Sequence, residues 1–356
     1  MLITLKHIAN QRKSLHKMAQ KRAIFFTVLF LYCCFTLPVF SQDINEAELN
    51  RIFTELNRAY GFCQGQSFTL NRIQNEIPEL RSSALVARLD WNSVFGQSCD
   101  NVEKKISLLM GEKWLAHREK ILSPLKEALL ATTISRTDAN TFLEIIKKRA
   151  KGDIPSPILE TLLIFNPTFS DKPEVEMIQG FKKTFRTANH SKAKGVDFQI
   201  EYPMSWTPKE AVRPNIIQTI KSENGIGSNM VMLMVQDLPP FNGRKLTAKE
   251  KSSIFTTSLI KTIVPDDAVL LSSKPIVLDG HKGGMLVYDM TTERVDLKIK
   301  IRTVQFVTIY EDKMIMVNCS IGVSEQEIGK LDERYKRLEP LFKLIANSFV
   351  IQSQYK

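Results

Sequence analysis

The spacing of apolar residues changes once along this chain, and that change divides it into two differently folded parts. From Asp43 to about Phe165 apolar side chains recur every three or four residues, which is the period of an amphipathic helix. From Val196 onward they alternate with polar residues or form short apolar runs, as β-strands do. The sequence therefore predicts an α+β chain in which an all-α helical bundle precedes an antiparallel sheet packed with helices.

The helical part is expected to hold five to seven helices joined by short links. The first helix carries one apolar stripe, made of Leu49, Ile52, Phe53, Leu56 and Tyr60. Gly61 follows it as a stop signal, a second helix is expected from Ser67, and a third follows Pro78 and closes at Gly96. Further helical patterns cover Asp100 to Met110, Lys113 to Ala131, Asp138 to Ala150 and Pro157 to Phe165.

The second part holds seven strand candidates and two helical stretches. The strands are expected at Val196–Tyr202, Asn215–Lys221, Asn229–Gln236, Val269–Val277, Gly283–Glu293, Leu297–Tyr310 and Lys313–Ile321, and the helices at Thr247–Ile263 and Ser324–Ala346. Strands separated by only a few residues must pair antiparallel, because a parallel return needs a dozen or more. The third strand is apolar almost throughout, which predicts burial on both faces, with Met230, Met232 and Met234 in the core.

A short motif and the order of elements after it carry a family resemblance. Residues Phe198 to Trp206 read FQIEYPMSW, an alternating strand that runs into Tyr-Pro and a Trp. Strands, a helix, a strand into Leu278–Gly283, long hairpins and a terminal helix follow. In these features residues from about Val196 to Ile351 resemble PsbP/Mog1-like domains, whereas the helical half resembles no family. The resemblance implies a compact sheet with helices on its faces, roles mostly in binding or assembly, and no active site to carry over.

An apolar run from Ala23 to Phe40 follows a leader with six basic residues and no carboxylate. This pattern predicts a signal peptide over residues 1–41 that is cleaved after Ser41, and Met18 offers an alternative start of ordinary proportions. The competing interpretation is an uncleaved anchor, since the run approaches the ~20 residues that span a bilayer. The protein is thus expected to be periplasmic or secreted, with membrane contact only if residues 23–40 are kept.

Behind the signal, composition places a helical domain at 42–165, a linker rich in Pro, Ser and charge at 166–195, and the α+β domain at 196–356. Without the six leader cations, 43 Lys and Arg stand against 38 Asp and Glu, a net charge of +5. That balance does not indicate a nucleic-acid partner.

Chemical motifs are absent from the sequence. It has no zincin, Cys-x-x-Cys, nucleophile-elbow or phosphate-loop motif, and its three histidines beyond the leader, His117, His190 and His281, are scattered. His281, in a Gly-flanked turn, is expected to be an exposed turn residue. No metal, cofactor or catalytic residue is predicted.

One charged pattern could bind a partner. Lys298, Lys300 and Arg302 alternate with Ile299 and Ile301, so the three cations share one strand face. They could form a basic stripe for an acidic partner, or they could belong to an ordinary solvated sheet face.

The cysteines suit an oxidising compartment. Cys63 and Cys99 each follow a predicted helix end, and a disulfide between them would persist outside the cytoplasm. Cys319 lies inside a predicted strand, where a buried thiol is the usual role.

Together these features indicate an exported binding or assembly protein without catalytic activity, whose partner is a protein or another envelope component. Two alternatives stay open: an extracytoplasmic hydrolase whose site is assembled from distant residues, and a membrane-anchored scaffold that keeps its leader.

The first prediction is that the mature chain begins near Gln42, because the cleavage site lies at Val39–Ser41. The intact mass of the exported protein measures this. Retention of residues 23–40 would instead support the membrane anchor.

Overall fold

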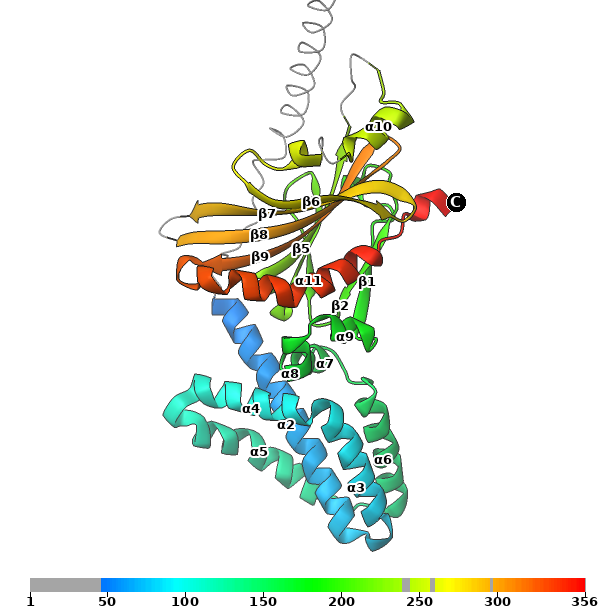
Figure 1. The fold of residues 1–356 in the computed structure, drawn as a ribbon. Coiled ribbons are helices and arrows are strands. Elements are labelled where there is room, and N and C mark those ends of the chain that lie inside the picture. The colour runs from blue at the N-terminus through cyan, green and yellow to red at the C-terminus, as the bar shows by residue number, and fades with distance from the viewer. Residues whose placement is uncertain (1–45, 239–243, 257–259, 295–296, 356) are drawn as a thin grey trace, which may run out of the picture.

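The computed structural model describes residues 46–238, 244–256, 260–294 and 297–355 (Figure 1). The predicted signal peptide lies outside these residues. Among the helices of the described part, none is long and apolar enough to cross a membrane.

The N-terminal half is a helical bundle built around one long helix. Its helices are α2 (Glu46–Glu76), α3 (Arg81–Trp91), α4 (Gln97–Met110), α5 (Trp114–Leu130), α6 (Arg136–Ala150) and α7 (Ile158–Ile164). Helix α2 packs against α3, α4, α5 and α7, and its buried Tyr60, Leu70 and Ile73 form the centre of the helical core.

Two helix ends expected from the sequence are wrong. Gly61 does not stop α2, and Ser67 does not begin a second helix, because α2 is continuous to Glu76. A Cβ on Gly61 or on Gly65 would lie within 4 Å of α5 side chains, so these glycines allow close packing between the two helices. Likewise Gly96 closes nothing, since a π-helical turn at Asn92–Gly96 joins α3 directly to α4.

A disulfide connects two of these helices. Cys63 of α2 and Cys99 of α4 lie with their sulfurs 2.07 Å apart and their Cα atoms 5.9 Å apart. Both cysteines lie inside helices and not beyond helix ends, since α2 does not stop at Gly61. Cys319 is a free, buried thiol in the sheet, as its position in the sequence indicates.

The segment 166–195, expected to be a linker, is folded. It forms α8 (Pro167–Asp171), α9 (Glu174–Ile178) and β1 (Lys182–Arg186), which pairs with β2 (Gln199–Pro203) in a two-stranded sheet. Its apolar residues are shared between the two halves, because Phe169 and Phe181 join the helical core while Met177 joins the sheet core.

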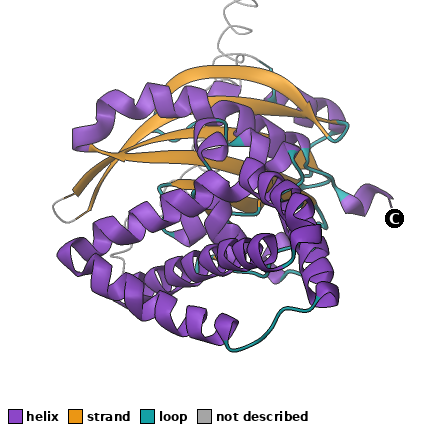
Figure 2. Ribbon diagram, turned by 90° about the horizontal axis from the view of Figure 1, so that it is seen from below, coloured by secondary structure: helices purple, strands orange, loops and turns teal. Residues whose placement is uncertain are grey.

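The C-terminal half contains a seven-stranded antiparallel sheet with the order β3-β4-β5-β9-β8-β7-β6. Its strands are β3 (Thr207–Glu210), β4 (Ile216–Lys221), β5 (Asn229–Asp237), β6 (Val269–Leu278), β7 (His281–Arg294), β8 (Leu297–Tyr310) and β9 (Lys313–Ser324). The α+β class is confirmed, because helices come first along the chain and the antiparallel sheet follows. Figure 2 shows the helices in purple and the strands of the sheet in orange. Only β1 and the edge strand β3 were not predicted.

Both faces of the sheet are covered, so its inner strand β5 is buried on both sides, as predicted. Val231, Leu233 and Val235 of β5 belong to the core under α11 (Leu331–Asn347). Met232 and Met234 belong to a separate core, to which the helix α10 (Ala248–Ile254) contributes. Figure 1 shows α10 above the sheet and α11 below it, on the side of the helical bundle.

The second prediction concerns the disulfide. Replacing both Cys63 and Cys99 with Ser frees a loop of sequence separation 36, and the chain-entropy model puts the loss of unfolding free energy at about 3–4 kcal/mol. Hydrogen exchange measured by mass spectrometry should show lost protection in α2 and α4, with β5 and β9 unchanged because they lie in other cores. Equal protection in both proteins, or peptide mapping that finds both wild-type thiols free, would contradict it.

Candidate functional site

A pocket of about 360 Å³ lies where the helical half meets the sheet domain. Helices α2, α4, α7 and α8 line it on one side, and α9, the β2–β3 turn, the β4–β5 hairpin and α11 on the other. Figure 1 shows α7, α8 and α9 between the bundle and the sheet domain. The pocket's apolar wall is made of Ile52, Phe165, Phe169, Trp206, Ile226 and Leu338.

The β4–β5 hairpin reaches α2 across this junction. Asn224 donates from its side-chain amide to Glu55 Oε2 at 2.9 Å, and its carbonyl accepts from Arg51 Nη2 at 2.9 Å. Asn224 has a φ of 54°, a left-handed conformation that Asn tolerates better than most residues. The left-handed backbone of Asn224 therefore closes the hairpin and directs the Asn224 side-chain amide toward the helical half.

Strand β1 is joined to α7 by a second polar contact. Lys183 Nζ lies 2.9 Å from Glu160 Oε1, which also accepts from the Ser156 hydroxyl at 2.9 Å. Burial by itself would raise the pKa of Glu160, but the hydrogen bond from Lys183 and the others lower it overall. This pair fixes β1, and with it the β2–β3 turn, against the helical half.

Glu176 of α9 is the buried carboxyl of the pocket wall. Its Oε1 accepts from the Ser205 backbone N–H at 2.7 Å, and its Oε2 accepts from the Ser205 hydroxyl at 2.7 Å. Only 4% of Glu176 is exposed. Burial raises the pKa of Glu176 to about 7, although the hydrogen bonds from Ser205 and the charge of Lys183 act in the opposite direction.

A serine that donates to a carboxyl with a pKa near neutrality could in principle be a nucleophile beside a base. Here Ser205 is itself only 5% exposed, and both Glu176 oxygens are occupied by the same residue. The residues that line the pocket include no histidine. Within the described ranges no group of three or more His, Cys, Asp or Glu residues could hold a metal ion. The pair fixes the β2–β3 turn to α9.

Ser222, at the end of β4, is the unsatisfied polar group of the pocket. Its hydroxyl is buried and has no hydrogen-bond partner in the part of the chain that the structure describes. Because an unpaired buried hydroxyl has a free-energy cost of roughly 1–3 kcal/mol, a bound molecule that accepts from it would recover part of that cost.

The predicted basic stripe lies elsewhere and is only partly exposed. Lys298 is exposed, and Lys300 lies 3.4 Å from an oxygen of Asp289. Arg302 is buried, with bidentate bonds to Asp289 at 2.7 and 2.9 Å and a further bond to Asp332 of α11. The expectation that all three cations face solvent is wrong for Arg302, because α11 covers its end of the strand. A partner-binding role for the stripe stays a prediction.

The histidines do not converge on a site. His281 is half-buried at the start of β7, 2.8 Å from the Gln354 side-chain oxygen and edge-on to Tyr310, so it is not the exposed turn residue expected. His117 bonds to Asn57 in the helical half.

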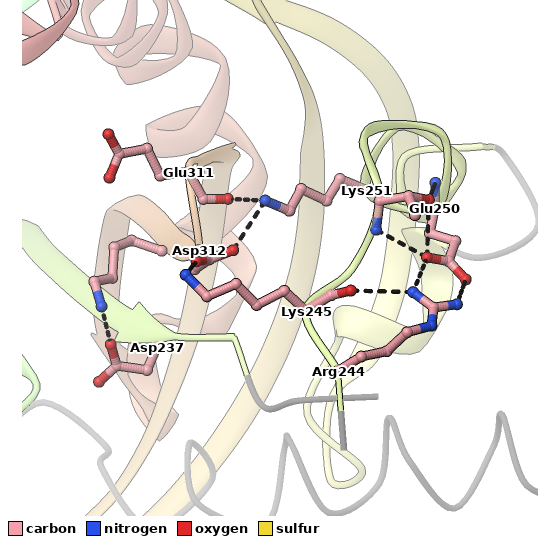
Figure 3. Close-up of polar contacts among 9 residues, drawn as sticks. Asp237, Arg244, Lys245, Glu250, Lys251, Glu311 and Asp312 are labelled. Atoms are coloured by element: carbon pink, nitrogen blue, oxygen red, sulfur yellow. Dashed lines mark hydrogen bonds and ion pairs between the residues drawn. The ribbon is translucent and has the colours of Figure 1, made fainter. Parts of the chain in front are cut away.

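A second polar cluster lies at the opposite end of the sheet (Figure 3). Asp312 accepts from Lys245 at 2.5 Å and from Lys251 at 3.1 Å, and these contacts lower the pKa of its carboxyl. Asp237 and Glu250 are likewise bound, by Lys194 and Lys313 and by Arg244, respectively. Asp237, Glu250 and Asp312 are thus each neutralised by a basic side chain. The ion pair between Lys251 and Asp312 fastens α10 to the β8–β9 turn.

Sequence reasoning missed the pocket because its residues come from segments far apart in the chain. Glu176 lies in the segment taken for a linker, and Ser222 lies at the end of a strand with no chemical motif around it. One signal was present: Ser205 and Trp206 end the FQIEYPMSW motif on which the family resemblance depends.

Comparison with family models finds no match to this chain, and comparison with curated proteins finds none. Solved structures do match. The cyanobacterial PsbP of Synechocystis is 15% identical, with 48% of this chain and 92% of that one covered and a TM-score of 0.29. The Ran-binding protein Mog1p of Saccharomyces cerevisiae is 8% identical, with 48% and 95% covered and a TM-score of 0.31.

A third structure, LpqN, is described as involved in cell envelope biogenesis of Mycobacterium tuberculosis. It is 8% identical, with 49% of this chain and 93% of that one covered and a TM-score of 0.27. Each of these matches covers about half of this chain. The likeness concerns the fold alone.

The third prediction is a pH dependence that Glu176 causes. Its pKa is about 7 in the folded protein and 4.5 ordinarily, so the folded state holds the proton more tightly. Its contribution to the unfolding free energy is complete below pH 4.5 and decreases as the pH rises to 7, by about 3 kcal/mol in all. Glu176→Gln does not titrate, so the variant should gain that amount over wild type between pH 4.5 and 8.

Denaturant unfolding of both proteins at pH 4.5, 6 and 8 measures this difference. Glu333→Gln, which replaces an exposed carboxylate on α11, is the matched control. A difference between wild type and Glu176→Gln that does not change with pH would show that the pKa of Glu176 is the same in the folded and unfolded states.

Proposed function

We propose that the protein is an exported binding or assembly protein of the cell envelope, that it performs no catalysis of its own, and that the interdomain pocket is its recognition site. The observation that carries this proposal is the composition of the pocket wall. Aromatic and aliphatic side chains from both halves surround a smaller number of hydroxyl, amide and charged groups, which is the usual make-up of a binding site.

The non-catalytic part of the proposal is supported by the state of Glu176 and Ser205. A serine nucleophile must reach the substrate, and its base must lie within hydrogen-bond reach of the proton that it takes. Both oxygens of Glu176 accept hydrogen bonds from Ser205, and the pair is buried. Its evident role is to position the turn that carries Trp206.

Export is supported by two independent features of the sequence and the fold. The leader has the charge and apolar pattern of a signal, and the Cys63–Cys99 disulfide suits an oxidising compartment. The partner is a protein or another envelope component, in keeping with the binding and assembly roles that the sequence resemblance implies. A scaffold that keeps residues 23–40 is the alternative on localisation.

A hydrolase is the second candidate function. The 2.7 Å contact between the Ser205 hydroxyl and Glu176 Oε2 favours it, because the carboxyl has a pKa of about 7. Turnover of an envelope substrate that Ser205→Ala abolishes would establish this alternative and overturn the binding proposal.

The fourth prediction tests the pocket with a side chain that blocks it. Ser170 of α8 lines the pocket and is exposed, so Ser170→Trp should obstruct the pocket without disturbing a core. We expect at least a tenfold weaker capture of the partner from envelope extracts. Thr168→Trp is the matched control, because Thr168 is exposed on the same short helix and does not line the pocket.

Two outcomes of that experiment are decisive. Loss of capture in Ser170→Trp alone supports the pocket as the recognition site. Equal capture by both Trp variants would exclude it, and the exposed Lys298 with the half-buried Lys300 would then be the next surface to test, with both replaced by Ser. Arg302 is left in place because its bonds hold α11.

A further inference from the structure

Two cations line the interdomain pocket without compensation. Lys105 of α4 and Arg337 of α11 are exposed lining residues, one from each half of the molecule. Neither makes an ion pair with any residue that the structure describes. This contrasts with the cluster around Asp312, where the lysines are paired.

A further cation lies beside them. Arg334 of α11 donates to Asn229, a lining residue, at 3.1 Å. Burial lowers the pKa of the Arg334 guanidinium, and the nearby charge of Arg337 adds to that effect, while Glu327 and Glu223 oppose it. Two like charges on one helix face, close to a pocket, create a positive potential that attracts anions.

The carboxylates of the pocket do not cancel this potential. Glu55 is ion-paired with Arg51 at 2.9 Å, and the charge of Glu223 acts on Arg334. Glu176 is buried and, with a pKa of about 7, carries less than a full charge at neutral pH. Among the described lining residues this leaves the exposed Glu223 as the one full negative charge without an ion pair, against the two cations Lys105 and Arg337.

The rest of the pocket suits an apolar body of limited size. Phe165, Phe169, Trp206 and Leu338 form its aromatic and aliphatic wall, and its volume of about 360 Å³ lies at the lower end of small-molecule sites. Ser222 lines the pocket, and its buried hydroxyl has no hydrogen-bond partner among the described residues. A buried donor, uncompensated cations and an apolar wall are thus brought together in one cavity.

We propose that this pocket binds an anionic amphiphile, a ligand with an apolar body and a carboxylate or phosphate head. The head is attracted by Lys105 and Arg337 and accepts a hydrogen bond from Ser222, while the body packs against the aromatic wall. The inference rests on the proposed function, since it names the chemical class that the same recognition site takes.

Four probes with the same eight-carbon body test the head group: octanoate, octyl phosphate, octan-1-ol and octylamine. Calorimetric titration of the mature protein at pH 7.5 and low salt should give about tenfold tighter binding for the two anions than for the alcohol, and the weakest binding for the amine. The ratio of octanoate to octyl phosphate identifies which head group the site prefers. Added salt should reduce the preference for anions, since the two cations are exposed.

Matched variants locate the effect. Lys105→Gln combined with Arg337→Gln should remove the preference for anions and leave binding of the alcohol unchanged. Lys104→Gln combined with Lys336→Gln should keep it, because these exposed neighbours do not line the pocket. Ser222→Ala removes only an unpartnered hydroxyl, so it should weaken anion binding without loss of folding.

The outcomes separate this inference from the proposed function. Equal binding of octanoate and octan-1-ol by wild type, or a preference that survives in the Lys105/Arg337 double variant, overturns the anionic ligand and leaves the pocket as a binding site. Binding of the probes that Ser170→Trp does not reduce overturns both proposals, because the ligand then lies elsewhere.

Discussion

The hydrogen-bonded pair of Glu176 and Ser205 is the interaction on which the junction between the two halves depends. A buried carboxyl has a large desolvation cost, and here two hydrogen bonds and a raised pKa limit that cost. The pair fixes the β2–β3 turn to α9. Because Met204 of that turn packs against the helical core and Trp206 belongs to the sheet core, fixing the turn places the two cores relative to each other.

The pocket is a consequence of how these elements meet. The β4–β5 hairpin contacts α2 through Asn224, and β1 contacts α7 through Lys183, so polar contacts connect the halves at separate points. Between these points aromatic and aliphatic walls face each other without filling the space. At the other end of the sheet, the lysines that pair with Asp312 fasten α10 (Figure 3). In contrast, Lys105 and Arg337 beside the pocket form no ion pair with a described residue and could bind a ligand.

Much of the fold follows from local periodicity. The alternation in the C-terminal half predicts β2 and six of the seven strands of the large sheet, all but the edge strand β3, and the apolar run of β5 predicts a strand that is buried on both faces. The sequence predictions that are wrong concern features that depend on tertiary packing. Gly61 looks like a helix end but packs against α5, and Arg302 looks exposed but lies under α11. The segment 166–195 is polar enough to resemble a linker, yet its few apolar residues are divided between two cores.

The pocket was beyond sequence reasoning for the same reason, since no local pattern brings Lys105, Ser222 and Arg337 together. The most direct test of the account is a crystal structure of the mature protein with bound octanoate. We predict the carboxylate head beside Ser222, Lys105 or Arg337 and the alkyl chain against Phe169 and Trp206. An octanoate molecule bound elsewhere, with the interdomain pocket filled only by water, would contradict it.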